Sequence, residues 1–264
     1  MSPRSQFLLH VLTSRGLRFG REDSFKLYHH GLLGERILLG TPANDLGCHE
    51  LLKIGADLGM PRCYEPLLRE QFGNANMVLF ALEDGEYGGV FKIYLEFWDQ
   101  LKHRVLTTGS SEPALLNVGV KWDIRSGSHY RTDYVCFPML SVGSILDRLE
   151  SIYRGHSGQP SHELSVRLIR QAAARDEAAS FIYVEVSEEG SPRKSFDINL
   201  YKANLAISDI RPLLTRLGQR YGIDSVCLQR LLGRVGERCL GHLSGGLDRH
   251  GRDFATIYYE ISLL

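Results

Sequence analysis

The sequence predicts an α+β fold built on a closed, ten-stranded antiparallel β-barrel with helices outside it. Five stretches of the 264 residues have the pattern of two short strands joined by a polar turn, and segments of helical period separate them. Along these strands apolar residues alternate with a polar set that is rich in tyrosine and in charges of both signs. Helices would cover the apolar face, and closure would enclose the polar face in a lumen and remove exposed strand edges.

The five expected hairpins follow one another along the whole chain. They cover about residues 24–40, 76–97, 115–137, 180–201 and 239–261. The first turn is placed at Gly31 to Gly34, and the others at DGEYGG, RSGS, SEEGSPRKS and DRHGRD. In each hairpin, β-branched and aromatic residues flank the turn, which is the pattern typical of paired antiparallel strands.

Helical segments are expected between the hairpins. Their apolar spacing places them at 4–16, 44–59, 64–72, 141–154, 161–179, 207–222 and 225–236. The order helix, strand, strand, helix then repeats about five times and forms one domain over residues 1–264. The polar stretch GHSGQPS (155–161) is the only plausible linker, and with it the alternative of two open sheets in separate domains stays open.

Composition narrows the classes of function. Thirty-one basic residues balance 31 acidic ones, whereas a nucleic-acid binder usually carries a basic excess. No apolar run reaches the length of a membrane span, and the first residues do not resemble a signal peptide. The five cysteines form no CxxC pair, so we expect a cytoplasmic protein with reduced thiols. His29, His30, His129, His242 and His250 have no metal-ligand spacing, so none is assigned a function and no metal ligand is expected.

Strand alternation assigns one polar set to the lumen. A polar strand face could instead meet solvent, but tyrosines recur at matching places in separate hairpins. The expected lumenal residues are Lys92, Tyr94, Glu96, Lys121, Asp123, Thr132, Tyr134, Glu185, Asp197, Asn199, Tyr201, Thr256, Tyr258 and Glu260. In the first hairpin, Glu22 and Lys26 share a face by the same alternation.

The unit order resembles that of the ABBA prenyltransferases, also called PT-barrel enzymes. The similar strings are EDSFKLYHHGLLGERILL (22–39), YEPLLREQFGNANMVLFALE (64–83), FKIYLEF (91–97) and ATIYYEIS (255–262). The resemblance covers most of the chain, is weakest over 98–180, and is greatest to enzymes that prenylate cyanobactins and related ribosomal peptides. Among these similarities, the spacing from Glu22 through Lys26 to Arg36 is the strongest support for the resemblance.

The resemblance implies a reaction and a set of residues. A prenyl diphosphate, usually dimethylallyl diphosphate, would ionise in the barrel, often with Mg²⁺ bound through its diphosphate. By position Glu22 matches the base, Arg36 and Lys92 match diphosphate-binding residues, and Lys121 or Arg131 could add a third cation. Tyr94, Tyr134, Tyr201 and Tyr258 would shield the allylic cation, with Asn199 and Thr256 as neighbours. Cations stabilise a departing diphosphate, aromatic faces stabilise an allylic cation, and a carboxylate can take the acceptor's proton.

The acceptor stays open at this stage. Glu96, Asp123, Glu185, Asp197 and Glu260 would make the lumen acidic; they could pair with lysines such as Lys92, Lys121 and Lys202, or hold a guanidinium. Arg, Tyr or Trp of a ribosomal or cyclic peptide are therefore the expected acceptors, and the short chain favours a wide mouth without a lid. We expect a monomer. The alternatives are transfer to a small aromatic metabolite and a non-catalytic barrel that binds a ligand.

Overall fold

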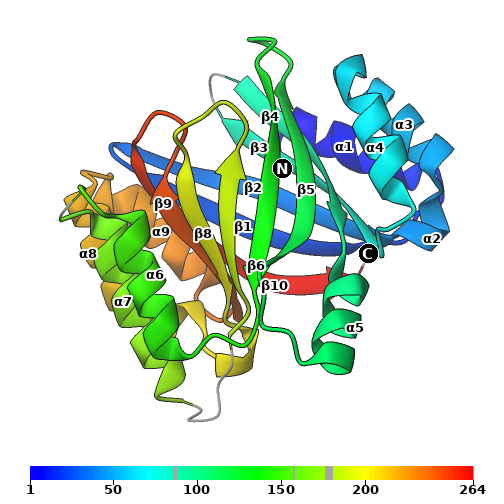
Figure 1. Cartoon of the computed structure of the whole chain (residues 1–264). Helices are drawn as coiled ribbons and strands as arrows, with labels where there is room; N and C mark the ends of the chain where they lie inside the picture. The colour runs from blue at the N-terminus through cyan, green and yellow to red at the C-terminus, as the bar shows by residue number, and fades with distance from the viewer. Residues whose placement is uncertain (86–87, 157, 176–180, 264) are drawn as a thin grey trace.

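Ten strands close into one antiparallel barrel in the computed structural model, which describes residues 1–85, 88–156, 158–175 and 181–263. The strands pair in the order β1-β10-β9-β8-β7-β6-β5-β4-β3-β2 (Figure 1). Their bounds are β1 Gly20–Tyr28, β2 Gly31–Pro42, β3 Met77–Gly85, β4 Gly88–Glu96, β5 Ala114–Asp123, β6 His129–Phe137, β7 Tyr183–Glu188, β8 Lys194–Asn199, β9 Leu240–Leu247 and β10 Asp253–Leu263. The predicted closed barrel of hairpins is confirmed.

The first hairpin turns earlier than its sequence predicts. Tyr28 pairs with Gly31, so the turn is at His29 and His30, and His30 has a positive φ of 58°. A side chain at Gly31 would lie 2.1 Å from the Tyr28 ring, so a larger residue where the strand begins would have to displace this exposed ring. Residues 31–34, predicted as the turn, therefore belong to β2. Part of the predicted DGEYGG turn (86–87) and the predicted strand start at Ser180 lie outside the described residues.

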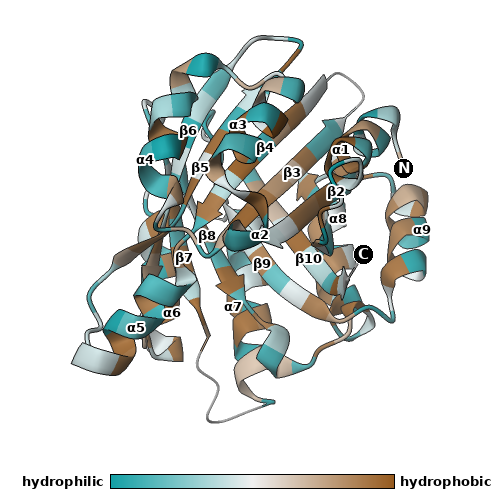
Figure 2. Ribbon diagram, turned by 90° about the vertical axis from the view of Figure 1, so that its right-hand side faces the viewer, coloured by the Kyte–Doolittle hydropathy of each residue, from teal (hydrophilic) through white to brown (hydrophobic). Residues whose placement is uncertain are grey.

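Two groups of helices cover the outside of the barrel, on opposite sides in Figure 1. One contains α1 (Pro3–Thr13), α2 (Ala43–Leu46), α3 (Cys48–Asp57), the 3₁₀ turn η1 (Arg62–Tyr64) and α4 (Glu65–Phe72). The other contains α6 (Val142–Ile152), α7 (Pro160–Ala173), α8 (Arg211–Arg220) and α9 (Ser225–Val235), with the 3₁₀ turns η2 (Tyr201–Ala203) and η3 (Ile207–Ile210) between β8 and α8. Two hydrophobic cores lie between these helices and the apolar strand faces, which are brown in Figure 2.

Several helix ends differ from the prediction. Gly47, with a φ of 75°, divides the expected helix 44–59 into α2 and α3. The helix expected over 161–179 ends at Ala173, and residues 176–179 of that prediction lie outside the described residues. Within the described residues, one helix rather than two lies between the second and third hairpins, and no helix follows β10. The fivefold repeat of helix, strand, strand, helix is therefore incomplete at these two places.

The helix α5 (Trp98–Thr108) is absent from the prediction and does not lie on the outer face. Its residues Trp98 and Leu101 belong to a small hydrophobic cluster with Val184, Ile182 and Cys136. Trp98, Ile182 and Val184 also line the lumenal cavity, so α5 packs against the inner wall at one end of the barrel. The mouth, expected to be wide and without a lid, is therefore bordered by α5 on this side.

The alternative of two separate open sheets is wrong, because all ten strands belong to one closed sheet. The predicted linker 155–161 lies between α6 and α7, and Pro160 already begins α7, while Ser157 lies outside the described residues. No helix within the described ranges is long and apolar enough to cross a membrane.

Candidate active site in the barrel lumen

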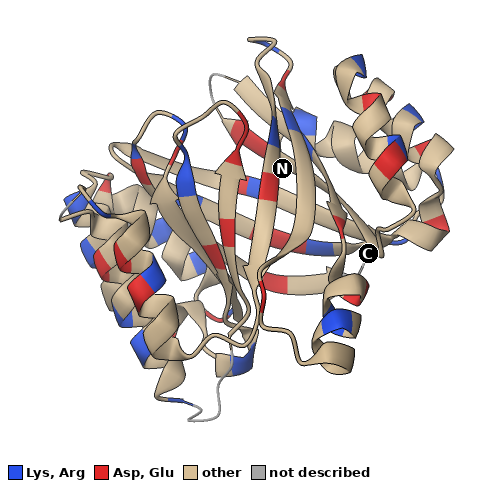
Figure 3. Ribbon diagram, viewed as in Figure 1, with Lys and Arg blue, Asp and Glu red and all other residues tan. Residues whose placement is uncertain are grey.

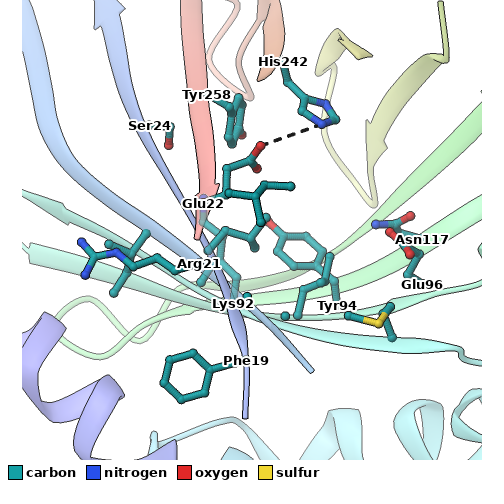
Figure 4. A pocket seen from close by; sticks show the side chains of 18 of the residues that line it. Phe19, Arg21, Glu22, Ser24, Lys92, Tyr94, Glu96, Asn117, His242 and Tyr258 are labelled. Carbon is teal, nitrogen blue, oxygen red and sulfur yellow. Dashed lines mark ion pairs between the residues drawn. The ribbon is translucent and has the colours of Figure 1, made fainter. Parts of the chain in front are cut away.

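A cavity of about 920 Å³ occupies the lumen. It begins at the rim near Phe19 and Trp98, opposite the hairpin turns, and extends down to a layer that contains Arg36 and Lys92. Figure 4 shows Glu22, Tyr94 and His242 among the side chains around it. Alternation along the strands directs these residues inward while their neighbours contact the helices. Charged residues consequently occur along the strands of the barrel as well as on the helices (Figure 3).

Basic residues meet one carboxylate at the inner end of the cavity. Glu83 contacts Lys92 Nζ at 2.7 Å, Arg36 Nη2 at 3.3 Å and Lys26 Nζ at 3.4 Å. Although burial acts in the opposite direction, these three cations hold the pKa of Glu83 well below its usual range. Arg36 also donates to Ser24 Oγ at 3.1 Å, while its buried Nε has no hydrogen-bond partner among the described residues. Arg36 and Lys92 therefore lie where they were predicted, around a carboxylate that the sequence reading did not single out.

Lys121 lies deeper in the same lumen and is 4% exposed. Its ammonium is 5.8 Å from the Tyr134 ring, and it has no ion pair within the described part of the chain. Burial and the neighbouring charges of Arg193 and Lys92 lower its pKa well below the usual value. Lys26, Arg36 and Lys92 thus contact the carboxylate of Glu83, and Lys121 adds a further buried cation to this region. An anion in this place would relieve the mutual repulsion of these cations.

Arg131 was predicted as a further lumenal cation, and this was wrong. Thr132 and Tyr134 are the residues of β6 that point inward, so Arg131 lies on the outer face. There its guanidinium pairs with Asp133 at 2.9 Å.

Three of the four predicted tyrosines line the cavity. The Tyr94 and Tyr134 rings meet edge to face with centroids 5.5 Å apart, and the Arg36 guanidinium lies 5.6 Å from the Tyr258 ring. Gly119 lies opposite Tyr94, and a side chain there would come within 2.5 Å of the Tyr94 ring. The absence of a side chain at Gly119 thus makes room for the aromatic wall.

Tyr201 reaches the site by a different route from the one predicted. β8 ends at Asn199, so Tyr201 belongs to the 3₁₀ turn η2 rather than to a strand. Its hydroxyl donates to Glu22 Oε1 at 2.8 Å. Tyr201 therefore orients the carboxylate instead of joining the ring of tyrosines.

Glu22 lines the cavity from β1, closer to the mouth than Arg36, whose strand partner is Ser24, and it is 8% exposed. Burial raises its pKa, and the charge of His242 and the Tyr201 hydrogen bond act against that rise. His242 Nε2 is 3.9 Å from Glu22 Oε1 (Figure 4), and His242 Nδ1 is 2.8 Å from Asp197 Oδ1. The sequence analysis assigned His242 no function; its alternation with Ser244 along β9 was the available signal.

Of the residues predicted to bind an acceptor, Asn199 and Glu96 line the cavity. Asn199 Nδ2 lies 3.3 Å from His242 Nε2. Glu96 accepts a long hydrogen bond of 3.4 Å from Asn76, and burial raises its pKa. Thr256, predicted as a neighbour, is buried on the inward face of β10, where it pairs with Lys26 of β1 and Ser244 of β9.

Three of the predicted lumenal carboxylates lie elsewhere. Asp123 caps the β5–β6 turn by accepting from the backbone N–H groups of Arg125 and Ser126. Glu185 is on the outer face of β7, where it pairs with Arg148 of α6 at 2.7 Å.

Glu260 is displaced by an irregularity in β10. Asp23 pairs with Tyr259 and Glu22 pairs with Ile261, so Glu260 is an extra residue, with a φ of 46°. Its carboxylate pairs with Arg238, while Ile261 lines the cavity. Lys202, considered as a partner for lumenal carboxylates, is exposed.

No group of three or more His, Cys, Asp or Glu side chains in the described ranges is arranged to hold a metal ion. The carboxylate nearest the basic residues, Glu83, is already bound by three cations. A divalent cation at this end would therefore need most of its oxygen ligands from a substrate.

Neither a family model nor a curated protein matches this sequence. Solved structures do match it. AnaPT from Neosartorya fischeri aligns with a TM-score of 0.54 and 10% identity over 91% of this chain and 78% of that one. The NotF prenyltransferase aligns with a TM-score of 0.51, 10% identity, and 91% and 80% coverage. NotF in complex with brevianamide F and DMSPP aligns with a TM-score of 0.53, 12% identity, and 91% and 79% coverage.

The chain has the PT-barrel fold. This confirms the predicted architecture over most of the chain, while the low identity limits the likeness to the path of the backbone. What the PT barrel of this chain does must therefore be argued from its own side chains.

Proposed function

We propose that this PT barrel is an enzyme that transfers a prenyl group from a prenyl diphosphate to a side chain of a ribosomal or cyclic peptide. The observation that carries the proposal is one cavity with a surplus of buried cations at its inner end, a tyrosine wall, and a carboxylate, Glu22, nearer its mouth. The NotF prenyltransferase, crystallised with DMSPP, supports a prenyl diphosphate as donor.

The residues divide the reaction into three tasks. Arg36, Lys92 and Lys121 stabilise the diphosphate as the carbon–oxygen bond breaks and the diphosphate leaves with the electron pair. Tyr94, Tyr134 and Tyr258 keep water away from the allylic cation and stabilise it with their faces. The acceptor atom then bonds to the allylic carbon, and its proton passes to the carboxylate of Glu22.

Mg²⁺ is proposed as a companion of the donor. It would be held by the oxygens of the diphosphate, since Glu83 is occupied by Lys26, Arg36 and Lys92. When bound, it would neutralise part of the charge of the leaving group.

A cationic acceptor fits the outer half of the cavity best. Glu22, Glu96 and Asp197 line it together with His242, and the charges of all three carboxylates act on the His242 ring. Paired carboxylates bind a guanidinium through parallel hydrogen bonds, so we propose a peptide arginine as the preferred acceptor, with tyrosine or tryptophan as the other candidates. This acceptor class is shared with the cyanobactin-type enzymes that the sequence resembles.

All of the proposed residues come from one chain, so we propose that the monomer is active. The five cysteines are unpaired, which agrees with the expected cytoplasmic location.

Calorimetric titration with a thiolo analogue of dimethylallyl diphosphate, with and without Mg²⁺, tests the donor site. We expect micromolar binding that falls at least tenfold in Arg36→Ala and in Lys92→Ala. Arg131→Ala is the matched control, because it removes an arginine from the outer face. If five-, ten- and fifteen-carbon analogues all fail to bind to folded protein, the barrel is not a prenyltransferase and binds some other ligand.

Peptides that differ at one position test the acceptor. We expect an arginine peptide to be prenylated faster than its lysine, tyrosine or tryptophan versions. Equal rates for all four would contradict recognition of a guanidinium. Transfer to a free aromatic metabolite but to none of the peptides would establish the alternative of a small acceptor.

A further inference from the structure

His242 connects the groups at the outer end of the cavity. It projects from β9 and faces Asp197 and Asn199 of β8, Glu22 of β1 and Tyr258 of β10. Tyr201 of η2 lies edge-on to its ring at 5.6 Å, and Glu96 of β4 is close enough for its charge to act on the ring. These are the titratable and polar groups around it within the described ranges.

The contacts of the two ring nitrogens define its protonation. Nδ1 is 2.8 Å from a carboxylate oxygen of Asp197, which can only accept, so Nδ1 carries a hydrogen. Nε2 is 3.9 Å from Glu22 Oε1 and 3.3 Å from the Asn199 amide nitrogen. The Asn199 amide is oriented by Tyr201, whose backbone N–H donates to Asn199 Oδ1 at 3.1 Å.

The amide of Asn199 alone would favour a neutral ring, with a lone pair on Nε2. The carboxylates oppose this, and a nearby carboxylate charge outweighs a single amide dipole. Burial lowers the pKa of His242, but Asp197 and Glu22 more than compensate and raise it to about 9. The ring is therefore an imidazolium at neutral pH.

An imidazolium in this place has a consequence for Glu22. Burial raises the pKa of Glu22, which would favour the protonated acid, and a protonated Glu22 cannot accept a proton. The charge of His242 is the largest influence that acts against this rise.

We propose that His242 is a positioning residue: held by Asp197, it remains an imidazolium that keeps Glu22 ionised and ready to receive the acceptor's proton. This inference rests on the proposed function for the part that Glu22 plays, but the charge of His242 can be measured without any reaction. In the catalytic step the proton moves from the acceptor to Glu22, and His242 neither gains nor loses one.

Side-chain NMR tests the charge directly. The histidine signal that is missing from His242→Gln should titrate with a midpoint above about 7.5 in the full-length protein, and the midpoint should fall toward about 6.5 in Asp197→Asn. His250→Gln is the control, since His250 is exposed in the β9–β10 turn. A midpoint at or below about 6.5 in the unsubstituted chain would mean a neutral ring and would overturn the proposal.

The pH dependence of kcat/KM tests the consequence for Glu22. In His242→Gln we expect the acidic limb of the profile to move to higher pH, so that the loss of kcat/KM is largest at acidic pH and becomes smaller as the pH rises and Glu22 ionises unaided. His242→Lys, which restores a positive charge, should move the acidic limb back toward that of the unsubstituted enzyme. A loss of equal size at every pH would assign His242 a purely structural part and contradict the proposal.

The two experiments also separate this inference from the function on which it rests. Donor binding, measured by calorimetry, should stay within about twofold in His242→Gln, because His242 lies away from Arg36 and Lys92. If the donor analogues fail to bind to any variant, the proposed function fails, whereas the NMR titration still decides the charge of His242.

Discussion

At the scale of single residues, Glu22 and Glu260 differ in ways that their sequence contexts do not reveal. Both are carboxylates on strands that pair with each other, yet Glu22 is buried in the lumen and Glu260 lies outside, paired with Arg238. We expect Glu22→Gln to lower kcat by about 10²–10⁴-fold, the range typical of a general base, with little change in donor binding. Glu260→Gln should retain nearly full activity. Steady-state kinetics, followed by formation of the prenylated peptide, checks both predictions. Losses of kcat of similar size in the two variants would show that Glu22 is not the base.

The His242 imidazolium also predicts how stability depends on pH. Its pKa is raised to about 9 from an ordinary value of 6.5, so its stabilising contribution is complete below about pH 6.5 and is lost as pH rises through 9. Thermal unfolding between pH 6.5 and 10 should show a decrease on the order of 1–3 kcal/mol that is absent in His242→Gln. His250→Gln should show the same decrease as the unsubstituted chain. An identical profile for all three would show that His242 is not charged in the folded protein.

At the scale of elements, β5 depends on one glycine. A methyl group at Gly119 would meet the Tyr94 ring at 2.5 Å, while one at Gly34 in β2 would meet no atom within 4 Å. We expect Gly119→Ala to lower the free energy of unfolding by about 1–3 kcal/mol and to increase hydrolysis of the donor relative to transfer, because Tyr94 no longer closes the wall. Gly34→Ala should change stability by less than about 0.5 kcal/mol. Denaturant unfolding and product analysis measure both effects, and an unchanged hydrolysis ratio in Gly119→Ala would contradict the shielding assigned to Tyr94.

The element that prediction missed, α5, also shapes the mouth. Its short apolar stripe differs little from that of a surface helix, and only the packing of Trp98 and Leu101 against Val184 and Cys136 shows that it lies at the rim. A molecule that enters the cavity at this rim would therefore pass beside α5 on its way to Glu22.

At the scale of the whole molecule, the closed sheet couples donor binding to global stability, since the basic residues come from different strands of one barrel. At a hundredfold excess over Kd, a donor analogue should stabilise the fold by about 2.7 kcal/mol. For a chain of this size that corresponds to a rise in Tm of roughly 5–10 °C. The rise should be smaller in Lys121→Met and unchanged in Arg131→Ala. An equal rise in both variants would place the anion away from Lys121.

The sequence by itself determined the strands, most helices and the barrel, because the alternation of apolar and polar residues is local and recurs in every hairpin. It also placed Lys92, Tyr94, Tyr134 and Tyr258 in the lumen, since strand parity holds across an unbroken strand, while Arg36 was assigned through the resemblance to the PT-barrel family.

Tertiary structure decided the rest. Glu260 lies outside because an extra residue in β10 reverses the parity, and Arg131 and Glu185 point outward because pairing between strands, rather than composition, selects the inward face of β6 and β7. The roles of Glu83 and His242 depend on partners that lie on other strands. His242, for example, is 220 positions from its partner Glu22 in the sequence. Charge interactions depend on distance in space, and only the closed barrel brings these residues together.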